Sequence, residues 1–334
     1  MKLGNKSRSL TFEEALALVC DESQPLSRKL LPYLSGAGRA EVERFAACWQ
    51  GTSEERRREL ITAMAEMAEA DYELDYNAIF RWSLMSTDPV VRERAVEGLW
   101  EDDQPSLIEP LIRMMREDPA EGVRARAASA LGRFALLAEL GDLPEECAHR
   151  LEQTLMAVIE DRREALEVRR RAVESVAYLS NAPVRAVIDE AYADPDRRMR
   201  LSAVFAMGRT ADPHWAEPIV KGLEDPDPAM RFEAARAAGE IALRPAVGRL
   251  IALLNDRDSE VRQMAIWALG QVGGSQARRA LEVCQASRDE AVREAAEDAL
   301  AELDFGSAPL DMFYYEADQE RDQDEPLGDD EADE

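Results

Sequence analysis

The sequence contains few aromatic residues, few glycines and prolines, and no strongly basic segment. Aromatic residues make up 6% of the 334 residues, alongside 17 glycines and 16 prolines. Sheets favour aromatic and β-branched residues joined by Gly- and Pro-rich turns, so this composition disfavours a sheet-rich fold. Charged residues at 33%, with abundant Ala, Leu, Glu and Arg, favour helices, and 46% hydrophobic residues are enough for a core.

The scarcity of positive charge restricts the class of partner. The formal net charge is −27, and residues 305–334 alone carry 12 acidic side chains against 1 basic one. Residues 51–304 carry 50 acidic and 33 basic side chains, so the excess is not confined to the end. Nucleic acids and anionic membranes both require a cationic surface, so we expect neither as a partner.

Long apolar runs are also missing. No stretch of 18 apolar residues occurs, and Glu13 and Glu14 interrupt the apolar segment near the start, so neither a transmembrane helix nor a signal peptide is expected. The four cysteines are widely spaced and form no C-x-x-C pair: Cys20, Cys48, Cys147 and Cys284. We expect them to be buried, small hydrophobic side chains of a cytoplasmic protein in a reducing compartment.

What the sequence does contain is an internal repeat. An apolar residue precedes an Arg, an Ala follows three places later, and a small-apolar-small triplet follows three places after that. The arginines are Arg92, Arg124, Arg169, Arg200, Arg231, Arg262 and Arg293, with gaps of 32, 45, 31, 31, 31 and 31 residues. The gap of 45 equals one period plus 14 residues, which we place around Leu136–Cys147. Such equal spacing predicts a stack of identical supersecondary units.

Each period is predicted to hold two helices. The second helix begins at an aspartate four residues before the Arg, where a carboxylate would cap free backbone N–H groups: Asp88, Asp196, Asp227, Asp258 and Asp289. An apolar stripe before each cap, such as Val247, Leu250 and Leu254, predicts the first helix. Glycines inside the second helices, at positions 132, 208, 239 and 270, imply close helix packing, because each costs about 1 kcal/mol relative to Ala.

The ends of the chain differ from the repeats. Residues 1–85 are predicted to form a helical N-terminal cap with degenerate repeats, with capping boxes at Thr11–Glu14 and Thr52–Glu55. Residues 86–304 form the repeat array. Residues 305–334 form an acidic tail expected to be disordered. Its aromatic segment, residues 310–316, either covers the last repeat as a cap or is a short linear motif for a partner or for the protein's own groove. The residues concerned are Met312, Phe313, Tyr314 and Tyr315.

The D-x-x-V-R-x-x-A-x-x-A-L-G pattern of residues 258–270 resembles the HEAT repeats known as phycobilisome-lyase HEAT-like repeats. The resemblance covers about residues 86–303. It implies an all-α, right-handed α-solenoid of the armadillo type with about seven repeats, whose second helices line a concave binding surface. It also implies that the repeated arginines pair with turn aspartates in a structural ladder. The alternative is an exposed row of arginines that binds anions.

Signals for catalysis are weak. The two histidines, His149 and His214, have no neighbouring carboxylate or second His at metal-ligand spacing. The His-Glu pairs of HEAT-type hydroxylases, phosphate-binding loops and nucleophile elbows are absent from the sequence, and DNA-alkylation HEAT enzymes need a cationic groove. We therefore expect no catalytic residues, no metal, no cofactor and no enzymatic activity. A bilin-lyase-like protein or lyase subunit is the alternative.

A partner-binding surface is predicted where aromatic residues replace polar ones. Positions two and six after the first inward residue of each second helix should face the groove and are mostly polar. Three adjacent repeats differ, at Leu201, Phe205, Phe232, Arg236 and Trp267. Clustered aromatics with an Arg are typical of interface hot spots, although the twist of the stack could instead bury them. Trp100 is expected to pack. The predicted function is a scaffold for an unidentified protein partner.

Overall fold

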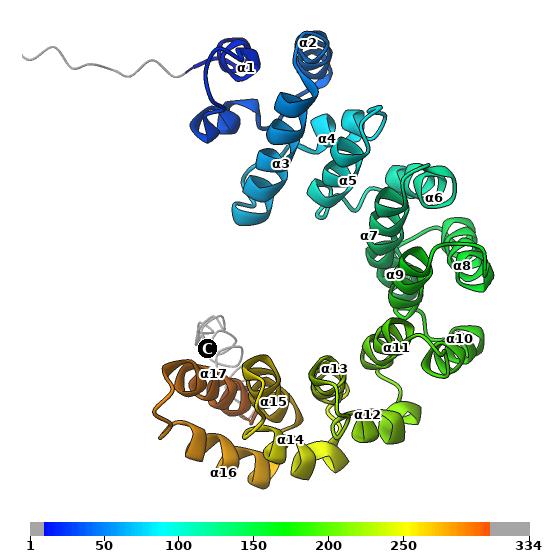
Figure 1. Ribbon diagram of the computed structural model, residues 1–334, viewed down its shortest axis with the longest axis vertical. Helices are drawn as coiled ribbons and strands as arrows, with labels where there is room; N and C mark the ends of the chain where they lie inside the picture. Colours follow the sequence, from blue (N-terminus) through cyan, green and yellow to red (C-terminus); the bar gives the residue numbers. More distant parts are fainter. Residues whose placement is uncertain (1–9, 308–334) are drawn as a thin grey trace, which may run out of the picture. The chain divides into compact units, whose positions relative to one another are not determined.

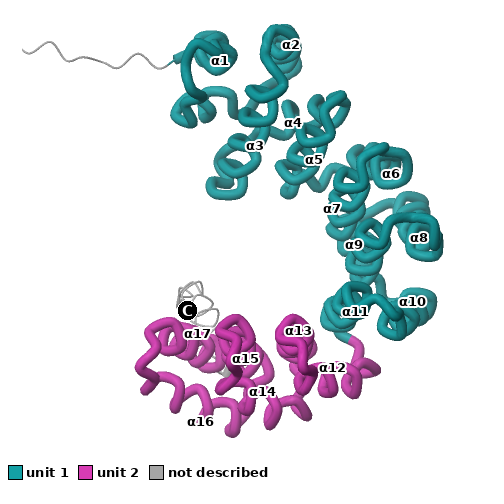
Figure 2. Tube along the Cα trace, in the orientation of Figure 1, with its two compact units in different colours: residues 1–211 teal, residues 212–334 magenta. Residues whose placement is uncertain are grey.

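The computed structural model describes residues 10–307, which contain helices and turns and no strand. The helices divide into two compact units, one ending at Ala211 (unit 1) and the other beginning at Asp212 (unit 2) (Figure 2). This division falls inside the predicted repeat array. No helix in the described part is long and apolar enough to span a bilayer.

Seven helical hairpins follow one another between residues 77 and 307 of the described part, and each repeated arginine lies in the second helix of one hairpin (Figure 1). In unit 1 the hairpins are α4 (Asn77–Ser83) with α5 (Pro89–Gly98), α6 (Ile108–Glu117) with α7 (Glu121–Glu139), α8 (Glu145–Glu160) with α9 (Leu166–Val176), and α10 (Ala182–Tyr192) with α11 (Arg197–Arg209). In unit 2 they are α12 (Ala216–Gly222) with α13 (Pro228–Glu240), α14 (Val247–Leu253) with α15 (Ser259–Val272), and α16 (Gly274–Cys284) with α17 (Glu290–Ser307). The predicted all-α repeat fold is confirmed.

The predicted aspartate caps start the second helices. Asp258, for example, accepts hydrogen bonds from the backbone N–H groups of Glu260 and Val261, at 2.9 and 3.3 Å. Asp88 caps α5 in the same way, and Pro89 follows at the first helical position, where its missing N–H costs nothing. Asp196, Asp227 and Asp289 make the equivalent bonds. The sequence therefore encodes where each of these helices begins.

The repeated arginines form a structural ladder, as the resemblance implied. Six of the seven donate Nη1 to the backbone carbonyl six residues earlier: Arg92, Arg124, Arg200, Arg231, Arg262 and Arg293. Two also form a bidentate pair with the turn aspartate of the next repeat: Arg92 with Asp118, and Arg231 with Asp256. The hydrogen bonds from Arg231 lower the pKa of Asp256. Arg92 and Arg231 therefore tie consecutive turns together, and the carbonyl bonds of all six anchor each second helix to the turn that precedes it.

The 14-residue insertion lengthens one hairpin. Helix α7 has 19 residues and α8 has 16, whereas α5 has 10 and α9 has 11. The connection between α7 and α8 turns at Gly141, whose φ of 80° is readily adopted by glycine. The extra residues extend existing helices instead of adding a new element.

The region before residue 77 is helical, and one of its two predicted capping boxes is wrong. It consists of α1 (Phe12–Cys20), a 3₁₀ segment at Arg28–Leu34, α2 (Arg39–Trp49) and α3 (Glu54–Ala70). The capping box of Thr11 with Glu14 is present. The box predicted for Thr52 with Glu55 is wrong: Ser53 caps α3, because its hydroxyl accepts from the N–H of Arg56. Thr52 instead donates to the carbonyl of Trp49, at 2.9 Å.

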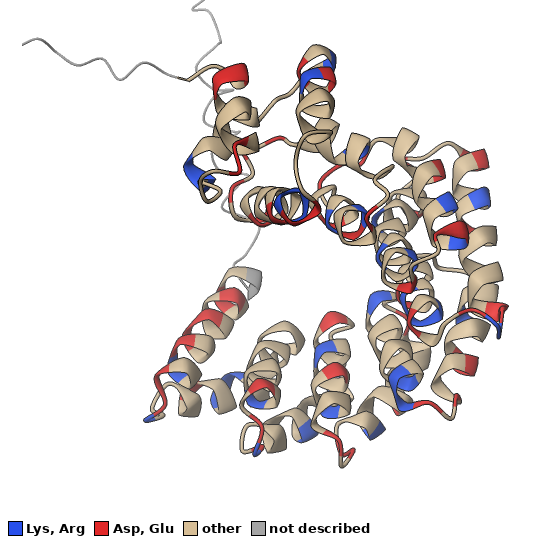
Figure 3. Cartoon of the chain, turned by 45° about the horizontal axis from the view of Figure 1, so that its top comes forward, with Lys and Arg blue, Asp and Glu red and all other residues tan. Residues whose placement is uncertain are grey.

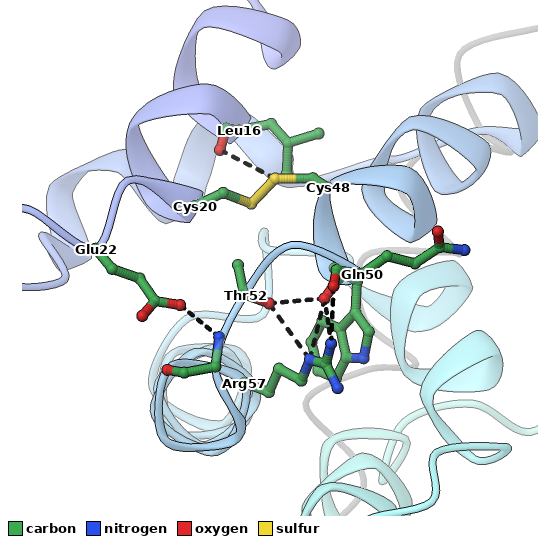
Figure 4. Close-up of a disulfide and its surroundings, with 9 residues drawn as sticks. Leu16, Cys20, Glu22, Cys48, Gln50, Thr52 and Arg57 are labelled. Carbon is green, nitrogen blue, oxygen red and sulfur yellow. Dashed lines mark hydrogen bonds between the residues drawn. A yellow bond between two sulfur atoms is a disulfide. The ribbon is translucent and has the colours of Figure 1, made fainter.

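A disulfide joins the ends of α1 and α2. Cys20 and Cys48 are bonded, with their Cα atoms 6.5 Å apart (Figure 4). The expectation of unpaired cysteines was therefore wrong for these two, because the packing of α1 on α2 brings together residues 28 positions apart. Cys147 is partly buried and unbonded, and burial raises the pKa of Cys284.

A thiol count tests this pairing. Protein denatured without reductant is expected to expose two reactive thiols, from Cys147 and Cys284, and reduced protein is expected to expose four. The Cys147→Ser, Cys284→Ser double variant should show none before reduction. Four thiols in the unreduced, denatured chain would show that Cys20 and Cys48 are not bonded.

Candidate partner-binding surface

The second helices form one row in each unit (Figure 1). Neighbours in the row pack on each other, α5 on α7 and α7 on α9 in unit 1, and α13 on α15 and α15 on α17 in unit 2. The sides of these helices that the first helices do not cover are called the second-helix face below. Acidic and basic residues interleave over the described helices of both units, without a broad basic area (Figure 3).

Two residues of the predicted partner-binding surface, Leu201 and Phe205, lie in unit 1. Leu201 and Phe205 are on α11, one turn apart, and both are half-buried. The Arg209 guanidinium lies 5.3 Å from the centre of the Phe205 ring and 5.8 Å from that of Tyr178. These distances are typical of cation–π contacts. Phe205 is therefore engaged with its own helix while keeping some exposure.

The other three lie in unit 2. Phe232 and Arg236 are half-buried on α13, and Trp267 on α15 is 37% exposed. Arg236 pairs with Glu233 and Glu240 on its own helix. The Trp267 ring lies over Gly239, so close that an added Cβ there would come within 2.5 Å of Cζ3. Trp267 thus packs between α13 and α15 and also reaches the second-helix face. That all five residues belong to one binding surface stays a prediction.

A hollow on the second-helix face of unit 1 was not predicted. It has a volume of about 230 Å³ and lies over α5, α7 and α9. Small residues of α7 form its floor: Gly122, Ala125 and Ser129. Charged residues form its walls: Glu93, Arg126, Glu167 and Arg171. The sequence contained a signal for this hollow, because the small residues Ala125 and Ser129 occupy the same two repeat positions that aromatic residues occupy in α11 and α13.

The charges around this hollow are paired with each other. Arg126 lies 3.9 Å from Glu93 and 3.7 Å from Glu97 across the gap between α7 and α5. Arg171 pairs with Glu167 and Glu174 along α9, at 2.8 and 2.9 Å. A charged partner entering here would have to exchange these pairs for its own. Because its two Glu and two Arg side chains balance, the hollow would select a partner by shape more than by net charge.

Three further predictions concern residues outside this surface. Trp100 was expected to pack, but it is 48% exposed at the end of the α5 turn, so that interpretation is wrong. Met312, Phe313, Tyr314 and Tyr315 lie outside the described residues. Within the described part of the chain, no group of three or more His, Cys, Asp or Glu residues could hold a metal ion. His149 instead lies 2.8 Å from the Gln153 amide nitrogen.

A protein-family model identifies the type of repeat. The model for HEAT repeats matches residues 77–149, 184–246 and 216–301, more than half of the chain. No curated protein sequence matches.

Similar solved structures include the complex of CpcE and CpcF of phycocyanin lyase from Nostoc sp., with 18% identity, 68% of this chain and 93% of that chain covered, and a TM-score of 0.46. Human deoxyhypusine hydroxylase has 22% identity, with 88% and 97% covered and a TM-score of 0.36. The Kap95:Nup1 complex has 17% identity, with 87% and 46% covered and a TM-score of 0.49. These likenesses are too distant to carry an argument about function.

Proposed function

Because the chain belongs to the HEAT-repeat family, we propose that it is a non-enzymatic scaffold that binds another protein on its second-helix face. The observation that carries the proposal is the combination of a partly exposed Trp267 with half-buried Phe232 and Arg236 on neighbouring second helices of unit 2. Aromatic and Arg side chains dominate the binding energy of protein interfaces. The repeated ladder arginines, by contrast, are engaged with carbonyls and turn carboxylates, which leaves them a structural role.

The test separates binding from stability. A partner is first identified by affinity purification of the full chain from its source cells, and its dissociation constant is then measured with purified protein. Phe232→Ala and Trp267→Ala are each expected to weaken binding by about 2 kcal/mol, roughly 30-fold. Both variants should remain folded, although Trp267→Ala should lose some stability because its ring packs on Gly239.

Val283→Ala provides the matched control, because Val283 is a 74% exposed apolar residue on the first helix α16. It should change neither binding nor melting temperature. If Phe232→Ala or Trp267→Ala instead loses 3–5 kcal/mol of stability, as core truncations do, while partner binding by the folded fraction is unchanged, these residues are core and not site. Covalent pigment on a co-expressed phycobiliprotein would favour the lyase alternative.

A cytoplasmic location is part of the proposal and can be tested by cell fractionation. The Cys20–Cys48 disulfide bears on it, because disulfides are rare in reducing compartments. A thiol count on protein extracted under acid-quenched conditions would therefore report on both questions: two thiols per chain would argue against a reducing cytoplasm.

A further inference from the structure

The lengthened end of α7 exposes leucines that the repeat array does not bury. Leu136 is 41% exposed and Leu140 is 64% exposed, and both lie in the 14-residue insertion. Trp100, in the turn after α5, is 48% exposed. Helix α7 is eight or more residues longer than its neighbours α5 and α9 in the row. An insertion that only lengthened a loop would not need exposed leucines.

Within unit 1, the turn that carries Trp100 lies beside the end of α7 that carries the two leucines. Arg133 donates Nη1 to the backbone carbonyl of Trp100, at 3.1 Å, which fixes the end of α5 against that side of α7. Leu136 and Leu140 follow Arg133 by three and seven residues, so helical periodicity places all three on the same face of α7. The second-helix face of α7 therefore ends in an apolar patch, defined here as Trp100, Leu136 and Leu140.

Exposed carboxylates lie close to the patch residues in the sequence, in the turns that follow α5 and α7 and in the first turn of α8. They are Glu101, Asp103, Asp142, Glu145 and Glu146, and none of them has an ion-pair partner among the described residues. The nearby cation is withdrawn from solvent: the Nε and Nη2 atoms of Arg133 are buried, and its guanidinium lies 4.8 Å from the centre of the Phe134 ring. A partner that covers the patch would thus meet apolar side chains, with exposed carboxylates in the adjoining turns.

We infer that this patch docks a basic, amphipathic helical segment of a protein partner. Apolar side chains of such a segment would cover Trp100, Leu136 and Leu140, and its Lys and Arg residues would face the unpaired carboxylates. An acidic segment would be repelled, and a purely basic one would leave the leucines in water. The inference rests on the proposed scaffold function and assigns it a second contact surface, separate from that of unit 2.

A designed peptide tests the chemistry directly. The probe is an 18-residue fluorescein-labelled peptide of Leu and Lys with one apolar helical face, and its control is a scramble of the same composition without such a face. Fluorescence anisotropy with the full chain should show at least about tenfold tighter binding of the amphipathic peptide. The Leu136→Ser, Leu140→Ser double variant should lose about tenfold or more in affinity, and Val283→Ser should change it less than about twofold.

Three results would overturn the inference: no binding of the amphipathic peptide, equal binding of the scramble, or unchanged affinity of the Leu136→Ser, Leu140→Ser variant. Circular dichroism should show that this variant folds, because both leucines are exposed. The two proposals can fail separately. If native partner capture persists in the double variant and peptide binding is unchanged, only this patch fails. If the full chain captures no protein yet binds the peptide through the leucines, the patch stands and the scaffold proposal fails.

Discussion

Replacing Arg92 with leucine is expected to lower the free energy of unfolding of unit 1 by about 3 kcal/mol. The Arg92 guanidinium donates Nε and Nη2 to the two Asp118 oxygens, both at 2.7 Å, and Nη1 to the Ser86 carbonyl at 2.7 Å. Both side chains are at most 10% exposed. Leucine would leave the Asp118 carboxylate buried without its cation and the Ser86 carbonyl without its donor, and both losses destabilise the folded state.

An exposed pair with the same geometry provides the control. Arg150 and Glu109 are also bidentate, at 2.8 and 2.7 Å, but their side chains are 59% and 61% exposed. Arg150→Leu should therefore cost less than about 1 kcal/mol. Urea unfolding followed by circular dichroism measures both. The Arg92→Leu, Asp118→Leu double variant should be more stable than Arg92→Leu alone, because no unpaired charge remains. Equal losses for Arg92→Leu and Arg150→Leu would contradict a structural ladder.

The repeat fold could be predicted because its determinants are local and periodic. Helix α15 shows this, because it begins at the aspartate four residues before the repeated arginine and buries the side that carries the apolar stripe. The partners of the ladder could not be predicted in full. Asp256 binds two of the repeated arginines, since its carboxylate accepts a hydrogen bond from Arg231 and its backbone carbonyl accepts one from Arg262. Whether a given arginine bonds to the carboxylate or to the carbonyl of a turn aspartate depends on how the turns are stacked in space.

The sites were harder to predict for the same reason. Cys20 and Cys48 lie in separate helices, and nothing in their spacing indicates that α1 packs on α2. Trp100 occupies a position that was expected to pack, but it lies in the turn after α5 and is 48% exposed, and its spacing in the sequence does not indicate which neighbours would cover its ring. Trp267 was predicted to be either groove or core, and it is partly both, because only a glycine on α13 lets its ring approach.

Replacing Gly98 with alanine is expected to destabilise unit 1 by about 2 kcal/mol, although alanine is the better helix former. Gly98 is the last residue of α5, and an added Cβ would lie 2.4–2.8 Å from three ring carbons of Phe80 on α4. Phe80 is fully buried, so its ring cannot move aside without disturbing the core. The overlap should outweigh the gain in helix propensity, which is at most about 1 kcal/mol.

Gly248→Ala is the matched control, because Gly248 lies in α14 and nothing would contact the new methyl group within 4 Å. It should raise stability by up to about 1 kcal/mol, so the same substitution should have opposite signs at two helical glycines. Gly98→Ala should cost less stability when it is added to Phe80→Leu than when it is added to the unmodified protein, because the smaller Leu side chain makes room for the methyl group. If Gly98→Ala stabilises the protein as Gly248→Ala does, the close approach of α4 and α5 is not what requires glycine at this position.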